Sequence, residues 1–133
     1  MVYAVSLYQV RSADVCALTY IDANSVNHGF VHNPFGAFAT FDAPGAGTGA
    51  YQGTGCSSDC PVSLNDWGAI TGNYIDANSV PHGYLRSPEG KIVTVDPQGT
   101  TFTWSSGLND SSTTTGYYVD ANDVYHGFLR IPD

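Results

Sequence analysis

Apolar and polar residues alternate along most of this chain in short runs, and turn-forming residues separate the runs. The clearest runs are "WGAITGNYID", "VPHGYLRS", "KIVTVD" and "TFTWSSG". Between them stand "DANSV", "SPEG" and "PQGT", which place Asp, Asn, Pro and Gly where tight turns use them. A period of two predicts β-strands, and no helical periodicity is present. We therefore predict an all-β fold.

The strand predicted at residues 80–87 carries apolar residues on both of its faces. Val80 and Tyr84 belong to one face, and Leu85 belongs to the other. A strand that is apolar on both faces is typical of stacked sheets, such as packed propeller blades. The Gly that follows each recurrent His, for example Gly83, indicates that another group approaches the strand closely there.

One phrase of eleven residues is written three times along the chain. It reads "YIDANSVNHGF" at 20–30, "YIDANSVPHGY" at 74–84 and "YVDANDVYHGF" at 118–128. The longer alignment around these phrases has a period of about 44 residues, which belongs to blade-like or solenoid repeats. Four strands in such a repeat match the size of one β-propeller blade.

These observations predict a β-propeller-like domain over residues 1–133, built from three four-stranded antiparallel blades. The repeat bounds are about 8–61, 62–107 and 108–133, with the last repeat completed by residues 1–7. The first repeat carries an insertion at residues 44–61, which contains Cys56 and Cys60.

The chain is acidic, with a formal net charge of −8 and four Lys and Arg residues in all. An acidic surface disfavours a nucleic-acid backbone or an anionic membrane as a partner. No run reaches the roughly 18 apolar residues of a membrane-spanning helix, so we predict no membrane insertion. The first ten residues lack the basic start and cleavage site of a signal peptide, and we interpret them as mature sequence.

Cys56 and Cys60 bracket "SSD" in a loop rich in Gly and Ser. This spacing allows a small disulfide ring, which we favour over free thiols. Zinc would need further ligands nearby, and the surrounding sequence offers none. Cys16 stands where the other repeats have Ile70 and Thr114, so we interpret it as a small core residue.

The combined pattern reads G-x-Y-x-D-A-x-x-x-x-H-G-F-L-R-x-P-x-G-x-x-x-T-x-D. It resembles the bacterial extracellular family of HAF repeats, and the resemblance covers roughly residues 13–133. This resemblance implies a β-propeller-like fold and a location outside the cell or on its surface. It implies little about activity.

Each repeat contains an Asp, an Asn and a His in the same order. The nine residues are Asp22, Asn24, His28, Asp76, Asn78, His82, Asp120, Asn122 and His126. A structural role is the preferred interpretation, because a turn Asp or Asn forms hydrogen bonds with its own backbone. An enzyme active site, in addition, normally occurs once in a chain, whereas these residues occur in every repeat. The alternative is a ligand site in each repeat. Calcium is the cofactor considered for it, although these oxygens are fewer than calcium prefers.

Aromatic residues fall into a recurring group and a scattered group. Tyr20, Tyr74 and Tyr118 recur, and we expect them to pack between blades. The others are free to serve binding, and a sugar ring could stack against them: Tyr8, Tyr51, Tyr117, Tyr125, Trp67 and Trp104.

No nucleophile elbow, zinc-protease, P-loop or dinucleotide-binding motif is present. We therefore expect a non-enzymatic extracellular binding or adhesion module, lectin-like or otherwise adhesive, and a carbohydrate is one ligand considered for it. The alternative is a structural subunit of a self-assembling oligomer or filament. A polysaccharide-active enzyme is the third hypothesis.

Three blades are fewer than a propeller usually needs to close. We expect residues 124–131 to meet residues 2–7 of a neighbouring copy, because open sheet edges recruit other chains. Two chains would then form a six-bladed ring, or many chains a filament. The alternative is closure within one chain.

Overall fold

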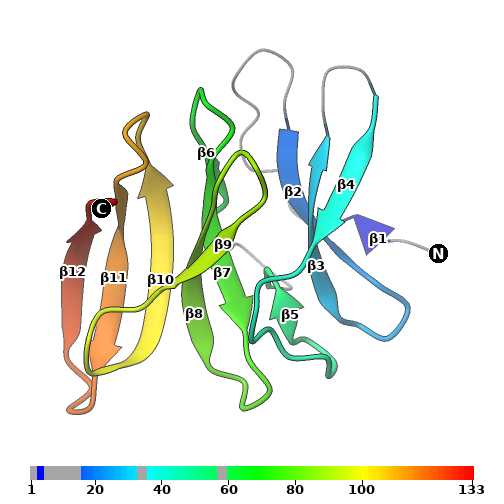
Figure 1. Ribbon diagram of the computed structural model, residues 1–133. Helices are drawn as coiled ribbons and strands as arrows, with labels where there is room; N and C mark the ends of the chain where they lie inside the picture. Colours follow the sequence, from blue (N-terminus) through cyan, green and yellow to red (C-terminus); the bar gives the residue numbers. More distant parts are fainter. Residues whose placement is uncertain (1–2, 5–15, 33–35, 57–59) are drawn as a thin grey trace.

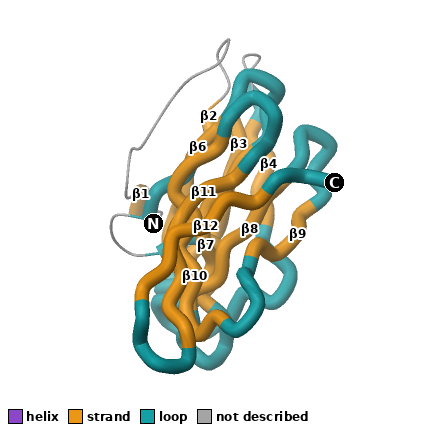
Figure 2. Tube along the Cα trace, turned by 90° about the vertical axis from the view of Figure 1, so that its left-hand side faces the viewer, coloured by secondary structure: helices purple, strands orange, loops and turns teal. Residues whose placement is uncertain are grey.

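The computed structural model describes residues 3–4, 16–32, 36–56 and 60–133. Within these ranges the chain is all-β, as predicted, and forms two sheets with no helix and no closed barrel. The strands run lengthwise, and their turns gather at the two ends of the molecule (Figures 1 and 2).

The strands in chain order are β1 (Tyr3–Ala4), β2 (Cys16–Ile21), β3 (Asn27–His32), β4 (Phe38–Phe41), β5 (Gly53–Thr54), β6 (Ser63–Leu64), β7 (Ile70–Ile75), β8 (Pro81–Arg86), β9 (Ile92–Val95), β10 (Thr100–Leu108), β11 (Thr114–Asp120) and β12 (Tyr125–Arg130). The larger sheet has the order β1-β2-β3-β5-β7-β8-β9, with β4 beside β3 and β6 beside β7. The smaller sheet has the order β10-β11-β12.

The repeated phrase forms an antiparallel hairpin in each repeat, and the register is the same in all three. The matched pairs are Tyr20↔His28, Tyr74↔His82 and Tyr118↔His126. On the far side of the hairpin, β3 pairs with β4 and β8 pairs with β9. Equal registers follow from turns of equal length that all begin with Asp-Ala-Asn, because turn type and length fix the pairing of a hairpin.

The four strands expected for repeat two do not share one sheet, so the four-stranded blade is not confirmed. The segment "TFTWSSG" lies in β10, which pairs with β11 of the next repeat. The turn after β9 carries the chain from one sheet to the other, and the N–H of Thr100 donates to the carbonyl of Pro97. Thr103 and Ser105 are buried on the inner side of β10. Packing between the sheets therefore decides where this strand goes.

β10 lies across the face of β7 and β8, side by side with them in Figure 1. The side chain of Asn73 makes two hydrogen bonds to the backbone of Ser105, donating to its carbonyl at 2.9 Å and accepting from its N–H at 2.7 Å. A Cβ at Gly83 would overlap the Ser105 side chain. The Gly after His82 therefore permits close packing of the two sheets, as its recurrence suggested.

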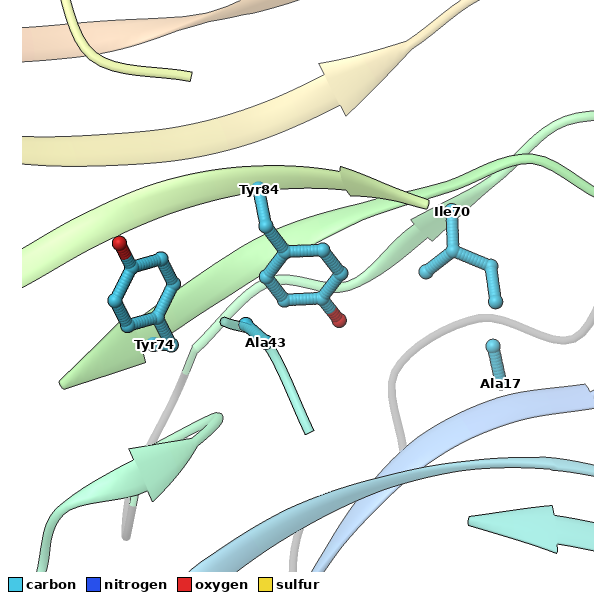
Figure 3. Packing of buried hydrophobic residues seen from close by; sticks show 5 residues of the cluster. All are labelled: Ala17, Ala43, Ile70, Tyr74 and Tyr84. Atoms are coloured by element: carbon cyan, nitrogen blue, oxygen red, sulfur yellow. The ribbon is translucent and has the colours of Figure 1, made fainter. Parts of the chain in front are cut away.

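The main hydrophobic cluster lies between repeats one and two (Figure 3). Its buried members are Ala17, Ala43, Ile70, Tyr74 and Tyr84. β7 is therefore covered on both faces, by this cluster on one side and by β10 on the other, and five of its six residues are buried. The prediction of burial on both faces concerned β8, where Tyr84 on one face and Leu85 on the other are both buried.

The insertion in repeat one joins the first two repeats. Its strand β5 pairs in parallel with β3 at Asn27 and antiparallel with β7 at Ile75 and Tyr74. Cys56 and Cys60 form the predicted disulfide, with their Cα atoms 5.7 Å apart. The inserted strand β5 is thus hydrogen-bonded to both hairpins and links them in one sheet.

Of residues 2–7, the structure describes Tyr3 and Ala4, which pair with β2 at Ile21 and Tyr20 of the same chain. Their contact with β12 of a second copy stays a prediction. Tyr8 lies outside the described residues, and so does the side chain of Cys16.

Candidate functional site

The recurrent Asp closes the tight turn of each hairpin. In repeat two, Oδ1 of Asp76 accepts hydrogen bonds from the N–H groups of Asn78 at 2.8 Å and Val80 at 2.9 Å. Ser79 adopts a left-handed conformation with φ of 63°. Asp22 and Asp120 make the same pair of bonds in their own turns. An Asp at this position stabilises a turn that places a non-glycine residue at positive φ.

The second oxygen of the same carboxylate reaches the recurrent His. Nε2 of His82 lies 3.2 Å from Oδ2 of Asp76, and Nδ1 lies 2.6 Å from Oδ2 of Asp96. The imidazole also stacks on the ring of Tyr74, with centroids 5.0 Å apart and planes 22° apart. His82 is therefore held by two carboxylates and one aromatic ring.

Repeat one has the same arrangement with slightly longer contacts. Nε2 of His28 lies 3.5 Å from Asp22, and Nδ1 lies 2.9 Å from Asp42. The ring stacks on Tyr20 with centroids 5.1 Å apart. The recurring Tyr residues thus pack on the His of their own repeat, and Tyr74 also belongs to the core between repeats one and two.

Repeat three keeps only half of the pattern. Nε2 of His126 lies 2.9 Å from Oδ2 of Asp120, and the ring stacks on Tyr118 at 5.0 Å. Within the described residues no second carboxylate contacts this His. Its side chain is also more exposed than that of His82, at 40% against 23%.

The structure brings the predicted Asp and His residues together, but it does not bring the Asn side chains to them. Asn24, Asn78 and Asn122 are exposed and contribute a backbone N–H to the turn. The partners that the sequence reasoning did not name are Asp42 and Asp96. Each follows its His by fourteen residues, and the "T-x-D" ending of the repeat pattern was the available signal.

The contacts shift the acidity of these groups in opposite directions. The hydrogen bond from the Val80 N–H is the main reason why the pKa of Asp76 lies below its usual value, and His82 lowers it further. Burial alone would lower the pKa of His82, but its hydrogen bonds to Asp96 and Asp76 outweigh burial and raise the pKa. Each group thus stabilises the charged form of the other.

Both ring nitrogens of His28 and His82 are engaged by carboxylates, so neither imidazole can reach a substrate while those contacts hold. In repeats one and two the arrangement links the turn of the hairpin to the end of the neighbouring strand, β4 or β9. In the described part of the chain, no group of three or more His, Cys, Asp or Glu side chains could hold a metal ion. A role for the nine residues in ligand binding stays a prediction.

A second candidate site is a row of four aromatic rings on the outer side of the smaller sheet, here called the aromatic face. Its members are Trp104 and Phe102 on β10, Tyr117 on β11 and Tyr125 on β12. The successive ring centroids are 5.8, 6.0 and 5.8 Å apart. The row crosses all three strands, because Trp104 pairs with Tyr117 and Tyr125 pairs with Val119.

The aromatic face is open to solvent at its β12 end. Tyr125 is 71% exposed and Tyr117 is 36% exposed, while Phe102 and Trp104 are partly buried. Three of the four were singled out as aromatics that do not recur. Phe102 was missed, although its alternation with Trp104 in "TFTW" was a signal that both share a face.

The other scattered aromatics lie away from this row. Trp67 is 73% exposed in the turn between β6 and β7, and Tyr51 is 66% exposed in the insertion. They do not add to a common surface with the aromatic face.

No protein-family model, curated protein or solved structure matches this chain. The described residues also contain no helix that is long and apolar enough to cross a membrane. The functional assignment therefore depends on the geometry of the chain itself.

Proposed function

We propose that this chain is a non-catalytic extracellular binding module that binds carbohydrate through its aromatic face. The observation that carries the proposal is the row of four rings across β10, β11 and β12, in which Tyr117 and Tyr125 are exposed. Exposed apolar patches of this kind mark ligand or protein contacts. Flat aromatic rings offer a large apolar surface against which the face of a sugar ring can pack.

The charge of the chain helps to choose between ligands that stack on aromatic rings. Nucleic-acid bases also stack on such platforms, but their binding depends on cationic side chains along the phosphate backbone. This chain has a net charge of −8. A neutral sugar fits an acidic protein better than a polyanion does.

An extracellular or cell-surface location is part of the same proposal. The disulfide between Cys56 and Cys60 supports it, because disulfides persist mainly in oxidising compartments. The resemblance of the three repeats to bacterial HAF repeats supports it as well.

A glycan array with the intact chain tests the proposal. We expect binding to a subset of neutral glycans, and a loss of about ten-fold or more in affinity for Tyr125→Ala, since one stacked ring contributes on the order of 1–3 kcal/mol. Tyr51→Ala is the matched control, because Tyr51 is similarly exposed but lies in the insertion. Absence of binding to every glycan at high protein concentration, or equal losses in the two variants, would count against the proposal.

A second candidate is a structural subunit that assembles through the same outer sheet. Leu85 on β8 is covered by the sheet of repeat three and is 8% exposed, whereas Leu129 at the corresponding place on β12 is 64% exposed. Sedimentation velocity of the wild type and of Leu129→Lys tests this candidate. Association that the substitution abolishes would favour a subunit over a glycan-binding module, and a stable monomer at every concentration would exclude assembly through this face.

A further inference from the structure

A pocket of about 310 Å³ lies between repeats one and two, at the end of the molecule opposite to the hairpin turns (Figure 1). A Cβ at Gly68 would lie 3.8 Å from the Cβ of Pro88, so the β6–β7 turn and the β8–β9 turn are neighbours there. The walls of the pocket include Val31 and Ala39 of repeat one and Trp67, Gly68, Arg86 and Pro88 of repeat two. The pocket thus belongs to an interface between two neighbouring repeats in the interior of the chain.

Trp67 stands at this pocket although its own turn does not require an aromatic residue. Oδ1 of Asn65 closes the turn by accepting a hydrogen bond from the N–H of Ala69 at 2.9 Å. Asn109 closes the corresponding turn of repeat three in the same way, and Ser111 stands there in the place of Trp67. Trp67 is also 73% exposed, so it adds little to the core. Its ring is therefore free to contact a ligand.

Arg86 brings a positive charge to the same pocket. Its guanidinium lies over the ring of Phe41, 5.0 Å from the centroid, and Nη1 donates to the carbonyl of Ser87 at 3.3 Å. Nε is buried and has no hydrogen-bond partner among the described residues. No carboxylate in the described ranges forms an ion pair with Arg86. A guanidinium has five N–H donors, so this one retains donors for an anionic group of a ligand.

The charges around the pocket favour one carboxylate over a polyanion. Lys91 follows Arg86 in the β8–β9 connection, and Glu89 lies between them in the sequence. Asp66 precedes Trp67. Glu89 and Asp66 are exposed, and neither lines the pocket, whereas Arg86 does. The net charge of −8 opposes a polyanion spread over the surface, but a single carboxylate directed at Arg86 meets a cation at short range.

The next interface along the chain does not repeat this combination of residues. Val93 stands at the position that corresponds to Ala39, and Ser111 stands at the position that corresponds to Trp67. The Arg is shared, since Arg130 corresponds to Arg86. The Arg therefore belongs to the repeat pattern, whereas the smaller wall residue and the exposed ring are particular to the interface between repeats one and two.

We propose that this pocket binds a carboxylate-bearing sugar, such as one uronic acid residue of an acidic polysaccharide. The apolar face of the sugar ring packs on the indole of Trp67, and its carboxylate accepts charge-assisted hydrogen bonds from Arg86. Small-molecule sites begin at about 300 Å³, so the pocket takes one sugar residue. The inference goes beyond the proposed function, because the aromatic face suits neutral sugars and this separate site requires a carboxylate.

A sugar fits this pocket better than a wholly apolar carboxylate does. Trp67 is largely exposed, so a ring packed on one face of its indole keeps its other face in water. A sugar ring suits that position, because it has an apolar face and carries hydroxyl groups around its edge. An aromatic carboxylate would leave one apolar face exposed to solvent, which is unfavourable.

The direct test is a fluorescence titration with methyl glucuronide, and methyl glucoside serves as the neutral counterpart with the same ring. The intact chain carries Trp104→Phe, which leaves Trp67 as its single tryptophan, since the chain has two. We expect a saturable change in the emission of Trp67 with the glucuronide. The glucoside should bind about ten-fold more weakly, because it lacks the charge-assisted hydrogen bonds to Arg86.

Two further variants locate the site, and a third serves as the matched control. Arg86→Gln should weaken glucuronide binding to the level of the glucoside and so remove the preference. Trp67→Ser introduces the residue of repeat three and should weaken glucuronide binding about ten-fold in calorimetric titrations. Arg130→Gln changes the corresponding Arg outside this pocket and should leave the affinity unchanged. Melting temperatures confirm that each variant is folded.

The salt dependence tests the role of Arg86 without any substitution there. Added salt should weaken binding of the glucuronide and leave that of the glucoside unchanged. Absence of a saturable response, or equal affinity for the two sugars, would overturn the proposal. Benzoate that binds as tightly as the glucuronide would assign the pocket to aromatic carboxylates instead. The emission of Trp67 reports on this pocket alone, and the glycan array tests the aromatic face, so failure of one proposal does not decide the other.

Discussion

The imidazole of His82 shows how one recurring residue serves the fold. It lies between Asp76 and Asp96 and stacks on Tyr74, so it joins a turn, a strand end and the core. His126 has one carboxylate and one ring instead. The two residues therefore form a natural comparison within one molecule.

His82→Ala should lower the free energy of unfolding by about 1–3 kcal/mol, because it removes hydrogen bonds and leaves two carboxylates without their partner. His126→Ala should have a smaller effect, since its side chain is 40% exposed and contacts one carboxylate. Urea denaturation followed by circular dichroism measures both values. Equal losses in the two variants would contradict the structural role, and unchanged stability of His82→Ala with loss of ligand binding would reassign His82 to a binding site.

At the scale of the elements, the stacking of sheets depends on which face of a strand meets a neighbour. β8 is covered by β10, whereas the corresponding outer face of β12 is exposed. The repeat therefore has a Leu at the equivalent position of both strands, but Leu85 is buried and Leu129 is exposed.

Leu85→Ala should destabilise the chain by about 2–5 kcal/mol, the usual cost of emptying a buried leucine site. Leu129→Ala should change the free energy of unfolding by no more than about 0.5 kcal/mol, because Leu129 is 64% exposed. Thermal and chemical unfolding of the two variants, measured in parallel, checks the pair. A large loss for Leu129→Ala in a monomeric sample would show that its face is covered after all.

The disulfide in the insertion holds the loop that β5 belongs to. Cys56→Ser with Cys60→Ser should cost about 2 kcal/mol, which is the chain-entropy value for so short a loop. Mass spectrometry after alkylation without reductant gives an independent check, since neither thiol should be labelled in freshly isolated protein. Labelling of both would contradict the disulfide.

For the whole molecule, the recurring Asp and His residues predict how stability depends on pH. The pKa of His82 is raised from its ordinary 6.5, so its contribution is complete below pH 6.5 and disappears as the pH rises through the raised value. The pKa values of Asp22, Asp76 and Asp120 are lowered from 3.8, so their contributions are present above pH 3.8 and are lost on further acidification.

The melting temperature should therefore be highest between about pH 4 and pH 6.5. His82→Ala should remove most of the decline that the wild type shows above pH 6.5. A wild-type profile that stays flat from pH 5 to pH 9 would contradict the role assigned to His82.

The period-two alternation was sufficient to predict an all-β fold, because alternation is a local property of a strand and needs no partner to be visible. The turn sequences "DANSV" and, in repeat three, "DANDV" likewise predicted the hairpins, since a turn Asp bonds its own backbone. The spacing of Cys56 and Cys60 predicted their disulfide because the two residues are close in sequence, with a separation of 4, so that the pairing is also a local property of the chain.

Interactions between distant segments were not visible in the same way. The assignment of β10 to the sheet of repeat three depends on how Asn73 and Ser105 meet across two sheets. Asp42 and Asp96 became partners of His only when β4 and β9 paired with their hairpins. The sequence shows that a strand has two faces and two edges, but packing and pairing of remote segments determine which of them is covered, and so which remain free to bind.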